Sequence, residues 1–373
     1  MTLRKVSGWS LALASAVAML SSSGALGAPT PAQAVLVAGQ GKNPGENALI
    51  IVDPAARKIV ARIPLSGQPH NIAVSPDGKT AYTSNALRGT DAKNYPGLTR
   101  TDADPDPLPS DTISVVDLEA QKEVRTIKVG AGANPHGIWY AAGKVYFTLE
   151  GNKTVGRYDP KHDLVDWIAG VGQNRVHELV VTQDGQKIFT ANIGSDNAAM
   201  LAPWDPKFDH IAEGERPLPW NVTLIPTGPG AEGIALSADE KEVWIVNGGD
   251  ATVAVIDVAT RKVVKTVPLN FEEPLRITIT PDGKRALVPS RAGEVAVLDT
   301  KTRSVIKRIP NVGTQIHGVV VSPDNSFAYT ASQGEAEVTI IDLKSYTVVG
   351  RIPTGTGKKA FDGIDGIGWA QRR

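Results

Sequence analysis

Four of the six histidines in this chain of 373 residues stand at the same position of a recurring segment. Each lies just before or at the start of a short apolar run, as at 317–321. The four are His70, His136, His177 and His317. Neutral imidazoles suit copper, zinc or iron, and carboxylates often complete such sites. The four histidines therefore predict a divalent metal site, with copper, zinc or iron as the candidate ions.

Three further copies of the segment carry a charged residue at the histidine position, namely Glu232, Arg276 and Asp365. A second hypothesis uses these residues without a metal. In it His136 and His177 provide the general acid or base, Glu232 orients the catalytic pair, and Arg276 holds a carboxylate. The sequence leaves both hypotheses open, with a metal ion or a small polar ligand bound among these side chains.

The histidine segment is part of a repeat of roughly forty residues, a period typical of stacked or ring-shaped architectures. In the copy at 315–355, four short β-rich runs alternate with turn sequences such as 322–325, and no helical period appears. This pattern predicts the four-stranded blade of a β-propeller. Complete copies are expected at 68–130, 134–172, 175–228, 231–270, 274–313 and 315–355.

Fragments of one more copy stand at the two ends of the chain. Three strands are expected at Val35–Ala38, Leu49–Val52 and Ile59–Ile63, and a lone first strand at Asp365–Ala370. Joined, they make a seventh blade in which the C-terminal strand pairs with the N-terminal three and closes the ring, leaving no free sheet edge. The predicted fold is all-β, a seven-bladed propeller of four-stranded blades over residues 35–373.

In such a blade the histidine position lies at the crossover into the innermost strand, so the seven residues should ring the mouth of the central channel. The ends of the second strands should add polar side chains to the same face. With Asp365, the predicted ligand-binding residues are Asn85, Glu150, Asn192 and Asn247. The aspartates that recur at tight turns are expected to cap those turns and to have no catalytic part.

Two blades depart from the regular period because they contain insertions. The first insertion, at 86–110, is rich in Asp and Pro, and the second, at about 193–221, carries Trp204, Phe208 and Trp220. Both are expected to begin in the loop between the second and third strands, on the face that carries the histidines. Long loops in compact domains often form lids or binding surfaces, although the Asp/Pro stretch could equally be disordered.

Three tetrads in the second strands carry a family resemblance: 82–85 (YTSN), 189–192 (FTAN) and 329–332 (YTAS). Together with the neighbouring Ser-Pro-Asp turns, they resemble the YVTN-repeat family of β-propellers over nearly the whole chain. Such propellers include lyases, lactonases, oxidoreductase subunits and binding proteins, so the resemblance implies a fold and leaves the activity open. Metal-assisted redox, lyase or lactonase chemistry is one expectation. A non-catalytic envelope scaffold that binds a protein partner, such as a periplasmic redox enzyme, is the alternative.

The N-terminal segment 1–34 has a basic start, an apolar run and a small-residue region, which predicts a secretory signal peptide. Small residues at 32–34 and at 25–27 offer two cleavage sites. The chain has no cysteine, and its 39 basic residues equal its 39 acidic ones, which argues against a nucleic-acid partner. The expectation is a monomeric periplasmic or secreted protein without a membrane span.

Overall fold

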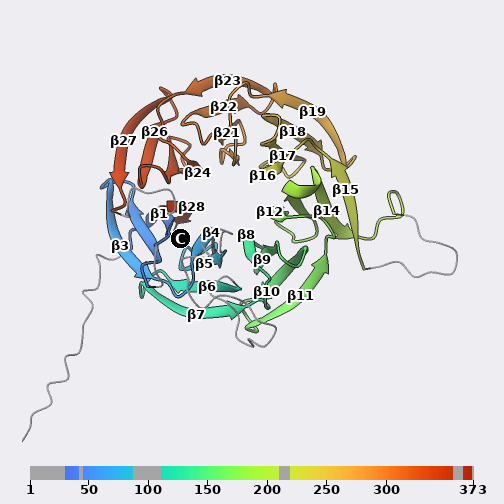
Figure 1. Cartoon of the computed structure of the whole chain (residues 1–373), viewed down its shortest axis with the longest axis horizontal. Coiled ribbons are helices and arrows are strands. Elements are labelled where there is room, and N and C mark those ends of the chain that lie inside the picture. Colours follow the sequence, from blue (N-terminus) through green and yellow to red (C-terminus); the bar gives the residue numbers. More distant parts are fainter. Residues whose placement is uncertain (1–29, 42–44, 87–110, 210–218, 356–363, 372–373) are drawn as a thin grey trace, which may run out of the picture.

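The computed structural model describes residues 30–41, 45–86, 111–209, 219–355 and 364–371. These residues form seven four-stranded antiparallel sheets, arranged as blades around a central channel (Figure 1). The predicted seven-bladed all-β propeller is confirmed. Within the described ranges the one helical element is the short 3-10 turn η2 (Ile193–Ser195), and none of these residues form a helix able to cross a membrane.

Each blade runs from an innermost strand beside the channel to an outermost strand at the rim. Blade 1 comprises β28 (Ile364–Gln371), β1 (Gln33–Gly39), β2 (Ala48–Asp53) and β3 (Lys58–Pro64). Blade 2 comprises β4 (Pro69–Val74), β5 (Thr80–Asn85), β6 (Thr112–Asp117) and β7 (Lys122–Lys128). Blade 3 comprises β8 (Pro135–Ala141), β9 (Lys144–Leu149), β10 (Thr154–Asp159) and β11 (Leu164–Gly170).

The remaining blades follow in chain order. Blade 4 comprises β12 (Val176–Val181), β13 (Ile188–Asn192), β14 (Asn197–Pro203) and β15 (Trp220–Pro226). Blade 5 comprises β16 (Ala231–Leu236), β17 (Glu242–Asn247), β18 (Thr252–Asp257) and β19 (Lys262–Pro268). Blade 6 comprises β20 (Thr278–Ile279), β21 (Arg285–Pro289), β22 (Val295–Asp299) and β23 (Ser304–Ile309). Blade 7 comprises β24 (Ile316–Val321), β25 (Phe327–Ser332), β26 (Glu337–Asp342) and β27 (Thr347–Pro353).

The ring closes as the two end fragments predict, because β28 pairs antiparallel with β1. Val35 lies opposite Trp369 and Val37 opposite Ile367, and the register shifts before Gly39. Strand β28 therefore becomes the innermost strand of the blade whose other three strands come from the N-terminus. Its C-terminal end lies beside the centre of the ring in Figure 1.

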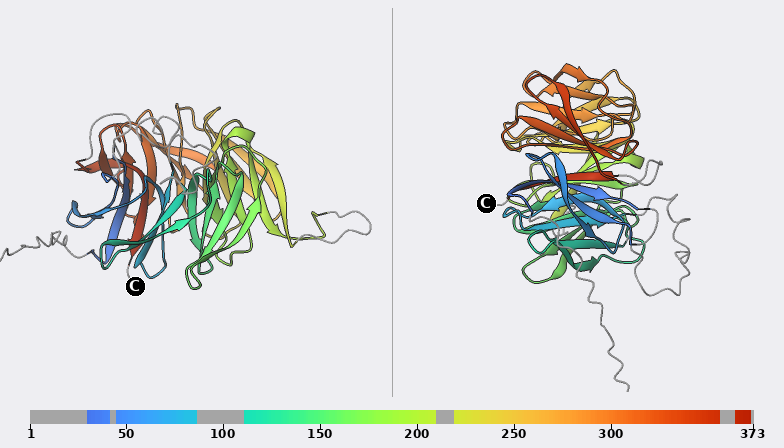
Figure 2. Two further views of the ribbon diagram at one scale, coloured as in Figure 1. Left: turned by 60° about the horizontal axis from the view of Figure 1, so that its bottom comes forward. Right: turned by 90° about the vertical axis from the view of Figure 1, so that its left-hand side faces the viewer.

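The hydrophobic core is divided among the interfaces between neighbouring blades. The middle strands are buried on both faces, as in β2 and β22, whereas the outermost strands expose most of their residues to solvent. Large side chains such as Trp244 and Phe189 are completely buried between two blades. Strands run between the two faces of the ring, so that loops gather on those faces (Figure 2). This arrangement makes the position of a residue along its strand decide which mouth of the channel it reaches.

The recurring aspartates cap turns, as the sequence predicts. In blade 1 the carboxylate of Asp53 accepts hydrogen bonds from the backbone N–H groups of Ala55 and Ala56, at 2.9 and 2.8 Å. Asp342 does the same for Lys344 and Ser345 in blade 7. These side chains replace backbone partners that a tight turn leaves unpaired.

The two insertions lie in different parts of their blades. The first falls between the second and third strands of blade 2, as expected, although residues 87–110 lie outside the described ranges. The second falls between the third strand, β14, and the outermost strand, β15, so its expected start in the loop after the second strand is wrong. The chain continues from Asn192 through the short turn η2 directly into β14, whose residues 197–203 complete a regular third strand. The described residues 204–209 consequently follow the end of β14 that is away from the histidines.

Candidate functional site

The crossovers bring the seven repeat residues together at one end of the channel. In each blade the repeat residue comes at the start of the innermost strand or just before it, so equivalent side chains face one another around the axis. Ion pairs and ring contacts link these side chains to one another and to their neighbours. In blade order the residues are Asp365, His70, His136, His177, Glu232, Arg276 and His317.

Asp365 lies between two of the histidines. Its carboxylate stands 3.3 Å from Nε2 of His70 and 3.2 Å from Nδ1 of His317. It also accepts a hydrogen bond of 3.1 Å from Nε2 of Gln40. Asp365 is fully buried, and each neighbour places a polar atom toward its charge. Asp365 therefore anchors His70 and His317 and stands between them.

His70, His136 and His177 form a row of three imidazole rings from three consecutive blades. Ring centroids are 3.9 Å apart for His70 and His136, and 3.7 Å apart for His136 and His177. Burial lowers the pKa of His136 well below its ordinary value, and the neighbouring His177 lowers it further. Burial likewise lowers the pKa of His177, with Arg276 acting in the same direction. Both rings are therefore neutral near pH 7 and keep a lone pair for a ligand.

Glu150 and Arg276 hold the two nitrogens of His177. Nδ1 of His177 lies 2.6 Å from Oε1 of Glu150, and Nε2 lies 3.1 Å from Nη1 of Arg276. A guanidinium has no acceptor, so Nε2 accepts from Arg276 and Nδ1 carries the proton donated to Glu150. The other carboxylate oxygen of Glu150 accepts a hydrogen bond of 3.2 Å from the side-chain amide of Asn134.

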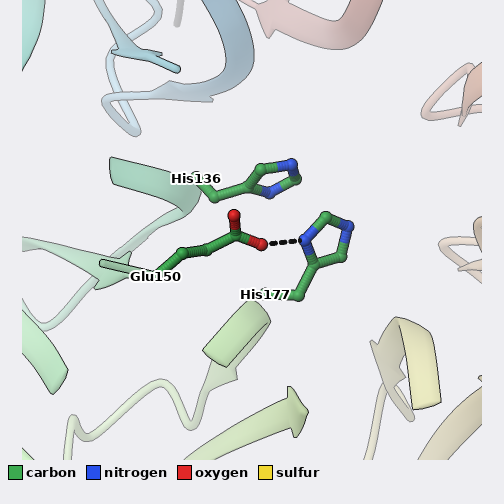
Figure 3. A group of neighbouring side chains, drawn as sticks. All are labelled: His136, Glu150 and His177. Carbon is green, nitrogen blue, oxygen red and sulfur yellow. Dashed lines mark hydrogen bonds and ion pairs between the residues drawn. The ribbon is translucent and has the colours of Figure 1, made fainter. Parts of the chain in front are cut away.

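His136, Glu150 and His177 form the one group of potential metal ligands found among the described residues. One donor atom of each lies within 4.8 Å of the others. Figure 3 shows the Glu150 carboxylate beside both imidazole rings, with its contact to His177 drawn as a dashed line. This grouping differs from the predicted set of four histidines, because Asp365 holds His70 and His317 instead. Glu150 was expected to bind a ligand, and its position makes it the third donor of this group.

Glu178 and Asn71 are polar neighbours of the site that the repeat pattern did not predict. Oε1 of Glu178 accepts a hydrogen bond from Nδ2 of Asn71 at 2.7 Å and lies 3.1 Å from Nη2 of Arg276. It also lies 3.2 Å from Nδ1 of His136. Arg276 is therefore engaged within the protein by an ion pair with Glu178, and its part in holding a substrate carboxylate stays a prediction.

The repeat distinguishes the positions of Asn71 and Glu178 by the residue type that most other copies carry there. Four of the seven copies carry glycine directly after the repeat residue: Gly137, Gly233, Gly318 and Gly366. A Cβ at Gly233 would stand 2.5 Å from the carbonyl oxygen of Leu275 in the next blade. Asn71, Glu178 and Ile277 occupy this position in the other three copies, and the side chains of Asn71 and Glu178 meet across the channel.

The predicted ligand-binding residues Asn85, Asn192 and Asn247 do not line the cavity beside the histidines. All three are fully buried, and their side-chain amides donate to the third strand of their own blade. Asn247, for example, donates to Oγ1 of Thr252 at 3.0 Å. Strand pairing aligns these asparagines with Leu149, one residue before Glu150. A shift of one residue changes the direction of a side chain, which is why Glu150 alone reaches the site.

A cavity of about 450 Å³ opens beside the histidines. Ten of its twelve lining residues are polar, the exceptions being Ala86 and Leu275. A second cavity, of about 420 Å³, lies further along the innermost strands, and its walls are polar and apolar in similar measure. Arg276 and His317 line both cavities, so the bridge from Arg276 to Glu178 stands between them.

Comparison with known proteins places the chain by its repeat and its fold. The model of the YNCE-like beta-propeller family matches residues 210–326. The chain is a seven-bladed β-propeller, and this match to a part of it is consistent with a YVTN-like repeat. No curated protein matches the sequence.

Solved structures of several other propellers are similar to this propeller at low identity. Hydrazine synthase of Kuenenia stuttgartiensis is 20% identical with a TM-score of 0.62, covering 79% of this chain and 89% of that one. A putative 6-phosphogluconolactonase of Bacteroides fragilis is 15% identical with a TM-score of 0.65, covering 92% and 99%. A functionally unknown protein of Desulfotomaculum acetoxidans is 10% identical with a TM-score of 0.68, covering 91% and 99%. At these identities the likeness concerns the fold, and function has to be argued from the site.

Proposed function

We propose that this propeller binds a divalent transition-metal ion through His136, Glu150 and His177 and presents it to the polar cavity. The observation that carries the proposal is the convergence of three donor atoms within 4.8 Å of one another. Two imidazoles and a carboxylate suit iron(II) and zinc, and copper is the third candidate. Three protein ligands leave coordination positions for water or for a small polar ligand from the cavity.

The surroundings of His177 supply the proton rearrangement that metal binding needs. Coordination through Nδ1 would require the single proton of the neutral ring to move from Nδ1 to Nε2. Oε1 of Glu232 lies 3.7 Å from Nε2 and would accept that proton in a hydrogen bond. Arg276 would then lose its acceptor on His177 and keep its ion pair with Glu178, at 3.1 Å.

Metal-assisted redox, lyase or lactonase chemistry would take place in the cavity beside the ion. A bound divalent ion polarises an oxygen of a substrate or lowers the pKa of a bound water. The chain's own part is to fix the ion with three side chains and to surround the ligand with charged groups. A signal peptide at 1–34, of which residues 1–29 lie outside the described ranges, would direct the protein to the periplasm or the medium.

A metal-free acid–base function is the second candidate, and the contact between Glu150 and His177 favours it. The 2.6 Å contact from Oε1 of Glu150 to Nδ1 of His177 fixes the tautomer that keeps the lone pair on Nε2. In this alternative His177 takes a proton from a ligand in the cavity, once Arg276 moves aside. Activity that survives complete chelation of metals would favour this candidate.

The scaffold alternative finds less support in the aromatic insertion. Trp204, Phe208 and Trp220 are half-buried rather than exposed. Phe208 lies under the guanidinium of Arg261, with 4.1 Å between that group and the ring centre, and Trp220 packs on Trp167 at 5.2 Å. A partner-binding scaffold would present such side chains to solvent.

The test is the metal content of purified protein after loading with zinc, copper or iron(II) and removal of free metal. We expect about one bound ion per chain, as for a site with a single set of ligands. His136→Ala, Glu150→Gln and His177→Ala should each lose the ion. His162→Ala is the matched control, because that histidine lies on an outer turn with its side chain 61% exposed. Wild-type protein that retains none of the three metals would overturn the proposal.

A further inference from the structure

Two arginines at the cavity lack close partners among the described residues. Nε of Arg175 lies 3.9 Å from Oε1 of Glu150, and Nη2 of Arg291 lies 3.9 Å from Oε1 of Glu232. Both distances exceed that of a hydrogen bond. Nε of Arg291 is buried and has no hydrogen-bond partner within the described part of the chain. The two guanidinium groups therefore keep donors that a ligand can use.

Arg175 and Arg291 serve the same region of the cavity although they come from different blades. Both line the cavity, and both act electrostatically on Glu232 in the blade between them. Burial raises the pKa of Glu232, and Arg276, Arg291 and Arg175 act in the opposite direction. Since Arg276 is paired with Glu178, the other two are the cations left to meet a ligand.

The backbone at Arg175 is in a conformation that favours glycine. Its φ is +52°, and the equivalent residue of the next blade is Gly230, with φ at +70°. Side chains other than glycine, asparagine and aspartate raise the energy of this conformation. Asn134 and Gln315 adopt the same conformation at the equivalent position of blades 3 and 7, with φ at +45° and +52°. An asparagine can therefore replace Arg175 without a change of backbone, as the test below requires.

We propose that the cavity binds a small carboxylic acid as its anion, with the carboxylate held by Arg175 and Arg291 and the remainder facing His136, Glu150 and His177. This inference rests on the proposed metal site, because the ion would bind the ligand's other polar atoms. A guanidinium offers two parallel N–H groups that match the two oxygens of a carboxylate. The ligand class is assigned from Arg175 and Arg291, because they line the cavity without close partners, and not from Arg276, which is paired with Glu178.

Charge and size favour one carboxylate over a phosphate group. The cavity lining places two glutamates, Glu150 and Glu232, beside Arg175 and Arg291. A carboxylate brings one negative charge close to these glutamates, whereas a phosphate dianion brings two and is repelled more strongly. A volume of about 450 Å³ is in the range of small-molecule sites.

The experiment measures binding of glycolate to the zinc-loaded, desalted protein by calorimetry, with glycolamide as the uncharged match and inorganic phosphate as a third probe. Arg291→Gln removes one cation, and Arg175→Asn removes the other while tolerating the positive φ. We expect each variant to weaken glycolate binding about tenfold, and glycolamide to bind no protein measurably. Arg57→Gln is the control, since Arg57 is exposed on a turn of blade 1 and donates to the backbone of Val349.

Zinc content is determined on the same samples so that the two proposals fail separately. Loss of zinc, copper and iron(II) alike from wild-type protein overturns the metal site. Retained zinc without glycolate binding, or glycolate binding that is unchanged in both arginine variants, overturns the carboxylate assignment alone. Tighter binding of phosphate than of glycolate, with the same dependence on the arginines, also overturns it.

Discussion

The carbonyl oxygen of His70 lies 1.9 Å from the point that a Cβ of residue 366 would occupy. Only glycine allows β28 to pass this close to β4, and Asp365 reaches His70 because of that approach. Gly366 is therefore needed both for ring closure and for the position of Asp365 in the site.

Replacement of Gly366 should weaken ring closure and disturb the contact between Asp365 and His70. We expect Gly366→Ala to destabilise the fold by about 1–3 kcal/mol, the range for overpacked interiors, because the obstacle is backbone. Gly170→Ala is the matched control, since a Cβ added there would meet nothing within 4 Å. Equal urea midpoints for the two variants would contradict the close approach.

Deletion of 362–373 should remove much more than a tail. It would take away the β28–β1 ladder and the burial of Ile364, Ile367 and Trp369 between blades 1 and 7. Each large apolar side chain contributes about 1.5–3 kcal/mol when fully buried, against a total of roughly 5–15 kcal/mol for a domain. We expect a much lower melting temperature or aggregation, while deletion of 372–373 alone changes neither.

The buried asparagines should matter for stability and leave the site intact. Asn247→Ala leaves the Thr252 hydroxyl without a bond of 3.0 Å. The Thr252 hydroxyl keeps its hydrogen bond of 2.8 Å to Asp250, so the expected loss is about 1 kcal/mol, the net contribution of one hydrogen bond. Zinc content should stay at the wild-type value, and a loss of zinc in this variant would show that Asn247 contributes to the site.

The proposed signal peptide should be cut before residue 30. Thr30 donates a buried hydrogen bond of 2.5 Å to the carbonyl oxygen of Leu118, and Gln33 and Ala34 pair with Gln371 and Ala370. Cleavage after Ala34 would remove these contacts, whereas cleavage after Gly27 keeps them. We expect the intact mass of the exported protein to match a chain starting at Ala28. A mass that starts at Val35 would show that these contacts are dispensable.

Alkaline stability should depend on a tyrosine beside the closing strand. Burial raises the pKa of Tyr329 to about 12, above the value of about 10 in an unfolded chain. Folding therefore favours the neutral phenol, and this contribution is complete below pH 10 and is lost between pH 10 and 12. We expect the melting temperature of wild-type protein to fall more steeply over this window than that of Tyr329→Phe. Equal falls in melting temperature for the two proteins would refute the assignment of this effect to Tyr329.

The sequence predicted the fold almost completely, because turn residues and β-rich runs recur in every blade. It placed all seven repeat residues at one mouth for the same reason. What it missed depends on single-residue register and on contacts across the channel. Glu150 and Asn247 differ by one position along their strands, and only strand pairing shows which one reaches the cavity. The pairing of Arg276 with Glu178 joins blades 6 and 4, and no local pattern encodes it.

The Arg276–Glu178 bridge also connects the two cavities electrostatically. Arg276 lines both cavities and Glu178 lines the second one, so a ligand in either cavity would meet the same ion pair from its own side. An anion that draws Arg276 away from Glu178 in one cavity would therefore leave an unpaired carboxylate facing the other. Binding in the two cavities would then be coupled through a single pair of charges.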